Sequence, residues 1–330
     1  MNYLNKKVTV VGAGAVGGLI AARLARHGCD VSVIARGKTL QAIAGNGLRL
    51  MTDTGLRTEV LRAVSEPAEL DVQDLVCIAV KTTALSQIAT QIAPLIGPDT
   101  LVVTAMNGVP WWFFEAPQLL QAGLRLQTLD PHGNLAAAIP AAQILGCVVH
   151  LSSSAPEPGV VRPGAGNRLI FGEALGGAST RLGSTVALFQ AAGFDAEAST
   201  DIRTDIWYKL WGNMTMNPLS AITGATCDRL LDDPLVHGYC LNAMQEAAQI
   251  GAEIGCPIIQ SGVERMQLTR KLGAFKTSML QDAEAGKPLE IDALVGAVQE
   301  IGQHVGIATP TIDSLLGLVR LFARSRGLHP

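Results

Sequence analysis

The chain has 330 residues, of which 48% are hydrophobic and 16% are charged, and its formal net charge is −3. This length exceeds what a single hydrophobic core usually serves, so two domains are expected. The composition excludes a disordered chain and gives no general attraction to nucleic acid or anionic membranes. No apolar run approaches the ~18 residues of a membrane span, and the start of the chain lacks a signal-peptide cleavage pattern. We therefore expect a cytoplasmic globular protein.

The six cysteines and six histidines are scattered along the chain. No C-x-x-C pair and no H-x-x-x-H pair occurs among them. Such spacing is typical of reduced, buried thiols and gives no disulfide framework and no zinc site. The sequence therefore predicts a protein without a bound metal.

Short apolar runs alternate with helical patterns in the first part of the chain. The expected strands cover residues 8–12, 31–35, 75–80, 101–106, 146–154, 167–173 and 194–199, and the expected helices cover 15–27 and 179–192. A turn-rich stretch, 155–166, separates two of the later strands. This alternation predicts an α/β fold with a parallel sheet covered on both faces. We place this first domain at residues 1–199.

The pattern changes to long helices beyond residue 200, which predicts an all-α second domain at residues 200–330. The expected helices cover 201–217, 234–255, 261–284, 290–306 and 310–325. Asp233-Pro234 and Thr309-Pro310 each combine a capping side chain with a proline at the first helical position. Pro218 is expected to end or kink the first of these helices.

The sequence G-A-G-A-V-G fills residues 12–17, between the first expected strand and the first expected helix. Gly12 permits a tight turn, Gly14 permits close approach of a pyrophosphate, and Gly17 permits close packing of the helix on the sheet. The helix N-terminus then offers N–H groups to phosphate. The candidate cofactor contacts are Gly12, Ala13, Gly14, Ala15, Val16 and Gly17.

The second strand is followed by Arg36, where an acidic residue would hold the ribose of NAD. Arginine attracts the 2′-phosphate of NADP and can stack on adenine, so the sequence favours NADP. An ordinary solvated arginine is the alternative. Lys81 and Asn107 follow the third and fourth strands. Ligands of open α/β sheets bind at these strand ends, so we expect both residues near the cofactor.

Lys209, Asn213 and Asn217 lie at i, i+4 and i+8, within roughly 80° of one another on a helix. An amine and two carboxamides can donate a proton and bind substrate oxygens, although a solvated helix face has the same pattern. Ser278 and Glu290 flank a turn between two helices. Each could bind or orient a substrate, or serve only as a polar helix residue.

These motifs together resemble the ketopantoate reductase family (2-dehydropantoate 2-reductase). They are the glycine turn with Arg36, A-V-K-T, N-G-V, K-L-x-x-N-x-x-x-N-P-L-S-A, and S-M-L-Q-D followed by E-I-D. The resemblance covers nearly the whole chain and implies a Rossmann domain followed by a helical domain of the 6-phosphogluconate dehydrogenase type. It implies that NADPH binds in the cleft between them.

The resemblance also implies roles for individual residues. Lys209 matches the family's catalytic lysine, and Asn213, Asn217 and Ser278 match its substrate contacts. Cofactor or active-site positions fall on Gly12–Gly17, Arg36, Lys81, Asn107 and Glu290. Ala155, just after an expected strand, is similar to a position whose backbone meets the nicotinamide end.

The implied reaction is reduction of a 2-oxo acid, such as 2-dehydropantoate to pantoate in pantothenate biosynthesis. Hydride comes from NADPH and a proton from Lys209. The alternatives are a related 3-hydroxyacid or opine-type dehydrogenase, and a non-catalytic NADPH-binding regulator.

Two features depart from the family pattern. A further family asparagine falls here on Cys227, and an aromatic run, Trp111–Phe114, follows Asn107. The run is interpreted as a hydrophobic plug, as a dimer contact, or as a change in the substrate pocket. A homodimer is a further expectation, since helical domains of this sort often provide dimer surfaces.

Overall fold

The computed structural model describes residues 6–329, which form two compact units. The first unit comprises the chain up to Met106 together with Gly133–Ile202, and the second comprises Asn107–His132 and the chain from Arg203 onward. The chain passes for the last time from the first unit to the second between Ile202 and Arg203, close to the boundary expected at residue 199. The segment 107–132 was expected in the first domain, but it belongs to the helical unit, where its aromatic side chains are buried.

The first unit is built on a ten-stranded sheet of order β4-β3-β9-β8-β7-β6-β1-β2-β5, with β10 paired to β9. Neighbouring strands are parallel along the part of the sheet with the order β8-β7-β6-β1-β2-β5. The pairs β3–β4 and β8–β9 are antiparallel. The strands are β1 (Lys7–Val11), β2 (Asp30–Ile34), β3 (Leu48–Thr52), β4 (Gly55–Glu59), β5 (Arg62–Val64), β6 (Leu75–Ile78), β7 (Leu101–Thr104), β8 (Ile144–Glu157), β9 (Val160–Glu173) and β10 (Asp195–Ser199).

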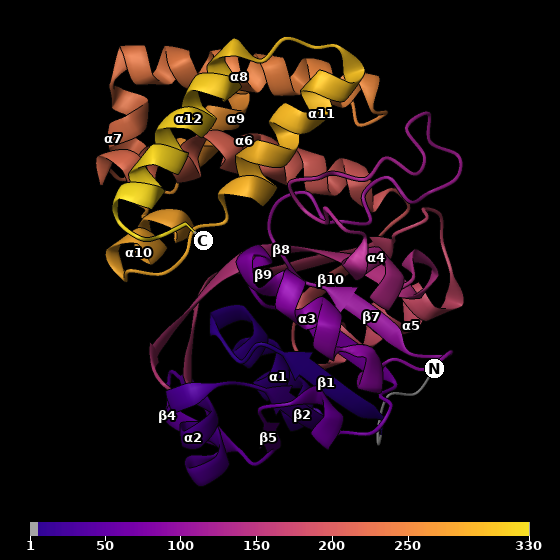
Figure 1. Ribbon diagram of the computed structural model, residues 1–330. Helices are drawn as coiled ribbons and strands as arrows, with labels where there is room; N and C mark the ends of the chain where they lie inside the picture. The colour runs from indigo at the N-terminus through magenta and orange to yellow at the C-terminus, as the bar shows by residue number, and fades with distance from the viewer. Residues whose placement is uncertain (1–5, 330) are drawn as a thin grey trace. The chain divides into compact units, whose positions relative to one another are not determined.

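The helices of this unit connect the strands, and α1 lies beside β1 and β2 in Figure 1. They are α1 (Ala15–Arg26), α2 (Gly37–Asn46), α3 (Leu85–Gln91), α4 (Asn134–Ala138) and α5 (Thr180–Ala191), with short 3-10 turns η1 (Pro67–Glu69), η2 (Thr82–Ala84), η3 (Ala93–Leu95) and η4 (Ala141–Gln143). Every strand of the sequence analysis is present. The β3–β4 hairpin and β5 were missed, because β4 is largely exposed and lacks an apolar run.

The turn-rich stretch 155–166 is not a loop. β8 and β9 continue through it as a long antiparallel hairpin that turns at Pro158 and Gly159. Gly159 has φ +71°, the left-handed conformation that a tight turn requires. The prolines and glycines therefore mark an exposed part of a hairpin, where main-chain pairing outweighs their poor strand propensity.

The second unit contains the helices expected after residue 200, with three differences, and one further short helix at Cys227–Asp232 that the sequence analysis did not predict. They are α6 (Ile202–Thr223), α7 (Cys227–Asp232), α8 (Pro234–Glu253), α9 (Gly262–Arg270), α10 (Ser278–Glu284), the π-helical turn η5 (Asp292–Gly296), α11 (Ala297–Val305) and α12 (Pro310–Ser325) (Figure 1). Asp233 caps α8 as expected, since its Oδ1 accepts hydrogen bonds from Leu235 N and Val236 N.

The three differences have identifiable causes. Pro218 does not end α6, which continues to Thr223, because burial of this stretch overrides the cost of the proline. The expected helix 261–284 is divided into α9 and α10 by Gly273, at φ +63°, and by a new cap at Thr277. The expected helix 290–306 begins with a π turn in place of an α turn. Among residues 6–329 no helix is long and apolar enough to cross a membrane.

Candidate active site

The glycine turn between β1 and α1 has the conformation that its three glycines were expected to permit. Gly12 has φ +99°, and a Cβ there would lie 2.7 Å from Val80 Cγ1. A Cβ at Gly17 would lie 2.0 Å from the Gly12 carbonyl oxygen, whereas a Cβ at Gly14 would meet nothing within 4 Å. Two glycines are therefore required by packing, and the third borders open space.

Gly14 is also the N-cap of α1 and has no side chain to bond the first N–H groups of that helix. Ala15 and Val16 begin the helix and are half-buried, while Ala13 is buried beneath the turn. Unpaired N–H groups and the positive end of the helix dipole make such a terminus suitable for a phosphate group. The loop therefore has the chemistry of a pyrophosphate site.

Arg36 follows β2 and is the exposed N-cap residue of α2. Its guanidinium donates to Gln87 Oε1 at 2.5 Å and to Gln91 Oε1 at 3.1 Å, both on α3. Because these partners are uncharged carboxamides, the guanidinium is oriented without being neutralised. This arrangement is suited to an anionic group such as a 2′-phosphate.

Two further candidates lie on the same sheet unit. Lys81 is half-buried and occupies the N-cap position of η2 after β6, as the strand-end argument expected. Ala155 was expected after a strand end, but it lies inside β8, in the exposed part of the β8–β9 hairpin. The strand was underestimated because its last residues are polar, small or proline.

The structure brings Lys209 and Asn107 together in the second unit. Lys209 Nζ donates to Asn107 Oδ1 at 2.7 Å, and both residues are half-buried. Lys209 lies on α6, whereas Asn107 lies at the turn where the chain leaves β7 and enters this unit. They are 102 residues apart in sequence. A charged amine beside a carboxamide oxygen is held in one direction, as a proton donor requires.

Asn213 and Asn217 continue the stripe along α6 from Lys209. Asn213 is half-buried and Asn217 is 5% exposed. Ser278 opens α10 and is exposed, and Glu290 directly precedes the helical stretch that contains η5 and is half-buried. All four lie in the unit that carries Lys209.

The aromatic run Trp111–Phe114 is buried, with exposed fractions between 0% and 6%. The Phe113 ring centroid lies 6.2 Å from that of Trp207 on α6. These side chains form a hydrophobic plug, and a dimer contact through them is excluded by their burial. Arg203, which the sequence analysis missed, lies over the rings of Phe113 and Phe114.

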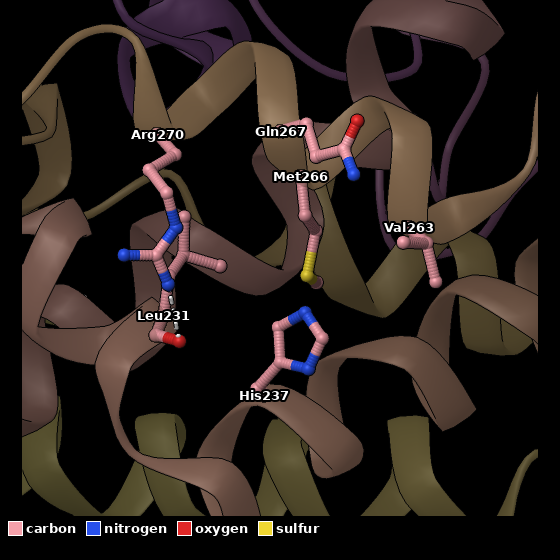
Figure 2. Close-up of a pocket in the computed structure, with 6 residues that line it drawn as sticks. All are labelled: Leu231, His237, Val263, Met266, Gln267 and Arg270. Carbon is pink, nitrogen blue, oxygen red and sulfur yellow. Dashed lines mark hydrogen bonds between the residues drawn. The ribbon is translucent and has the colours of Figure 1, made fainter.

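A cavity of about 220 Å³ lies among α7, α8 and α9. Figure 2 shows the ring of His237 facing the sulfur of Met266 across it, while Arg270 donates to the Leu231 carbonyl oxygen at 2.8 Å. The lining residues are Leu231, His237, Val263, Met266, Gln267 and Arg270. None of the predicted site residues lines this cavity. In the described chain no cluster of His, Cys, Asp or Glu could hold a metal ion.

Two family models match the chain. The model "Ketopantoate reductase PanE/ApbA" matches residues 8–176, and "Ketopantoate reductase PanE/ApbA C terminal" matches residues 201–323. The chain belongs to the ketopantoate reductase family. The resemblance and the fold class expected from the sequence are thereby confirmed: a Rossmann-like domain is followed by a helical domain.

Relatives of this family match over almost the full length. A 2-dehydropantoate 2-reductase from Mesorhizobium japonicum is 42% identical over 98% of this chain and 99% of its own. A structure from Ralstonia solanacearum assigned to the ketopantoate reductases is 59% identical, with a TM-score of 0.95, and covers 99% of this chain and 100% of its own. The chain is a ketopantoate reductase-type oxidoreductase.

Two more distant structures show the same fold. D-mandelate dehydrogenase, in a ternary structure with NADH and anilino(oxo)acetate, is 22% identical with a TM-score of 0.83, over 98% of this chain and 99% of its own. A dimeric ketopantoate reductase from Staphylococcus aureus is 20% identical with a TM-score of 0.72, over 97% of this chain and 100% of its own.

Proposed function

We propose that the protein uses NADPH to reduce a 2-oxo acid, 2-dehydropantoate or a close relative, to the 2-hydroxy acid. The observation that carries the proposal is the hydrogen bond between Lys209 Nζ and Asn107 Oδ1 at 2.7 Å. It holds the amine of Lys209 on α6, the helix that also carries the carboxamides Asn213 and Asn217 at i+4 and i+8.

Lys209 hydrogen-bonds the keto oxygen of the substrate and gives it a proton as negative charge develops there. One group then acts both as general acid and as electrostatic stabiliser. Asn107 holds the amine in the required direction. A bound reduced nicotinamide supplies the hydride.

The remaining candidates bind the rest of the substrate. Carboxamides donate and accept hydrogen bonds, so Asn213 and Asn217 suit a hydroxyl or carboxylate of the substrate. The Ser278 hydroxyl binds the substrate carboxylate, and Glu290 orients the reacting oxygen or the cofactor.

The first unit suits an NADP dinucleotide. The open space at Gly14 and the uncapped start of α1 would receive the pyrophosphate, and Arg36 would receive the 2′-phosphate. We assign Lys81 and Asn107 to the cofactor on their positions at strand ends and on the family resemblance, and Ala155 and Glu290 on the resemblance alone.

An assay of NADPH oxidation tests this function. The purified protein is offered 2-dehydropantoate, other branched 2-oxo acids, phenylglyoxylate, a 3-oxo acid and an amino acid with a 2-oxo acid, each with NADPH and with NADH. We expect turnover of a branched 2-oxo acid with preference for NADPH. Tight NADPH binding without turnover of any 2-oxo acid would instead identify a regulator, and turnover of a 3-oxo acid or an amino-acid pair would identify a different dehydrogenase.

Lys209→Ala should lose about 10²-fold to 10⁴-fold in kcat, the range typical of a general acid, while NADPH binding remains. Lys276→Ala is the matched control, because Lys276 forms an exposed ion pair with Glu284 in the same unit. Near-normal turnover by Lys209→Ala refutes the role of that lysine.

We further propose a homodimer in the cytoplasm. The dimeric family member from Staphylococcus aureus supports the assembly. All six cysteines are buried and none is part of a disulfide, which suits a reducing compartment. Sedimentation of the purified protein tests the dimer, and a single monomeric species at micromolar concentration contradicts it.

A further inference from the structure

Arg203 is a buried charge held by main-chain oxygens. It is 5% exposed and lies at the start of α6. Its Nε donates to the Phe113 carbonyl oxygen and its Nη2 to the Ile254 carbonyl oxygen, both at 2.9 Å. Its guanidinium carbon lies 4.7 Å from the centre of the Phe113 ring. Burying a charge is costly unless hydrogen bonds and ring contacts satisfy it, so the guanidinium must hold Phe113 and Ile254 in a defined geometry.

The two hydrogen bonds from α6 to residues 107–114, hereafter the aromatic segment, have matching spacing. Arg203 contacts Phe113, and Lys209 contacts Asn107. The spacing is six residues on both sides, so the segment runs antiparallel to α6. Six residues of helix rise about 9 Å. The segment matches this short span because it is folded by a turn in which Phe113 N donates to the Pro110 carbonyl oxygen at 3.2 Å.

The π turn holds the other end of the aromatic segment. Ala297 N donates to the Asp292 carbonyl oxygen, five residues back, in place of the Ala293 oxygen of an α-helix. The Ala293 oxygen accepts Val109 N at 2.9 Å. Gly108 has φ +79°, and a Cβ there would lie 2.4 Å from the same oxygen. The segment is therefore fixed at both ends, by η5 next to Asn107 and by Arg203 at Phe113.

We propose that Arg203 is a positioning residue that acts through the aromatic segment. By fixing Phe113 to α6, it restricts the movement of Asn107 relative to Lys209. It thereby keeps the Lys209 amine in its productive direction. This inference rests on the proposed function of Lys209 as proton donor. It assigns a reaction role to an arginine that touches neither Lys209 nor Asn107.

A double-mutant cycle tests the inference. Arg203→Met removes both hydrogen bonds while keeping an apolar contact with the rings. We expect kcat to fall by up to about 10-fold, the most that loss of the hydrogen bond between Asn107 and Lys209 should cost, with little change in KM for the substrate. In an Asn107→Ala background the same substitution should change kcat by no more than about 2-fold, since its route of action is gone.

Arg203→Lys provides a milder variant, in case Arg203→Met does not fold. It keeps the charge and one donor nitrogen in place of two, so its kcat should lie between those of the wild type and Arg203→Met. Arg23→Lys is the matched control, because Arg23 lies 4.4 Å from the centre of the Phe194 ring and donates to the Gly193 carbonyl oxygen at 3.0 Å in the first unit. Arg23→Lys should leave kcat unchanged.

The outcomes separate two failures. If the wild type reduces a 2-oxo acid but Arg203→Lys costs the same factor with and without Asn107, Arg203 is structural only and the inference is overturned. An unchanged kcat in folded Arg203→Lys and Arg203→Met overturns it as well. If the wild type reduces no 2-oxo acid, the proposed function fails before the cycle begins.

Discussion

Asn107→Ala removes the oxygen that accepts the hydrogen bond from Lys209 Nζ at 2.7 Å. A hydrogen bond to a charged group contributes about 1.5–3 kcal/mol. Both residues are half-buried, so water replaces part of the contact and the lower end of that range applies. A loss of about 1.5 kcal/mol from the transition state corresponds to about 10-fold in kcat/KM.

Steady-state NADPH oxidation with the best 2-oxo acid measures this loss, and thermal unfolding is followed on the same samples. The matched control is Asn134→Ala, an exposed asparagine at the start of α4. We expect the control to retain full activity and both variants to keep the melting temperature within a few degrees. An Asn107→Ala enzyme with wild-type kcat/KM would refute the claim that this contact directs the lysine.

Gly17→Ala should lower the melting temperature and raise the KM for NADPH, because its Cβ would lie 2.0 Å from the Gly12 carbonyl oxygen. Gly14→Ala should weaken NADPH binding at unchanged stability, because its Cβ would meet no protein atom within 4 Å. Equal effects of the two in binding and melting assays would contradict this distinction. Arg36→Glu should raise the KM for NADPH about 10-fold or more while affecting NADH less; a uniform effect on both cofactors would show that Arg36 does not bind the 2′-phosphate. Burial raises the pKa of the Cys77 thiol from its ordinary 9.0 to about 12, so the thiol favours the folded state below about pH 8.5 and loses that contribution as pH rises toward 12. Urea unfolding of Cys77→Ala should therefore show an alkaline slope that is shallower by about 1.4 kcal/mol per pH unit, and an unchanged slope would be inconsistent with a protonated native thiol.

Local sequence patterns determined most of the sheet and the helix starts. The strands β1 and β6 are mostly apolar and are buried on both faces apart from Lys7, and such runs leave few alternatives to a buried parallel strand. The cap at Asp233-Pro234 also has a purely local cause. The glycine turn is recognisable from a few residues, although Gly12 is also required by its packing against Val80. The sequence patterns failed where burial outweighed propensity, as at Pro218 inside α6, and where polar residues form strands, as in the β8–β9 hairpin.

The candidate site also has features that local sequence patterns determine and features that depend on tertiary contacts. By itself the sequence determined that a glycine turn precedes a helix, that an arginine follows the second strand, and that Lys209 shares a helix face with two asparagines, because each pattern is complete within a few residues. Only the tertiary structure decided that Asn107 meets Lys209 and that the aromatic residues join the helical unit around Arg203. Those contacts join residues about 90 to 100 positions apart, and what selects them is how the aromatic side chains are buried against α6, a property that no local periodicity encodes.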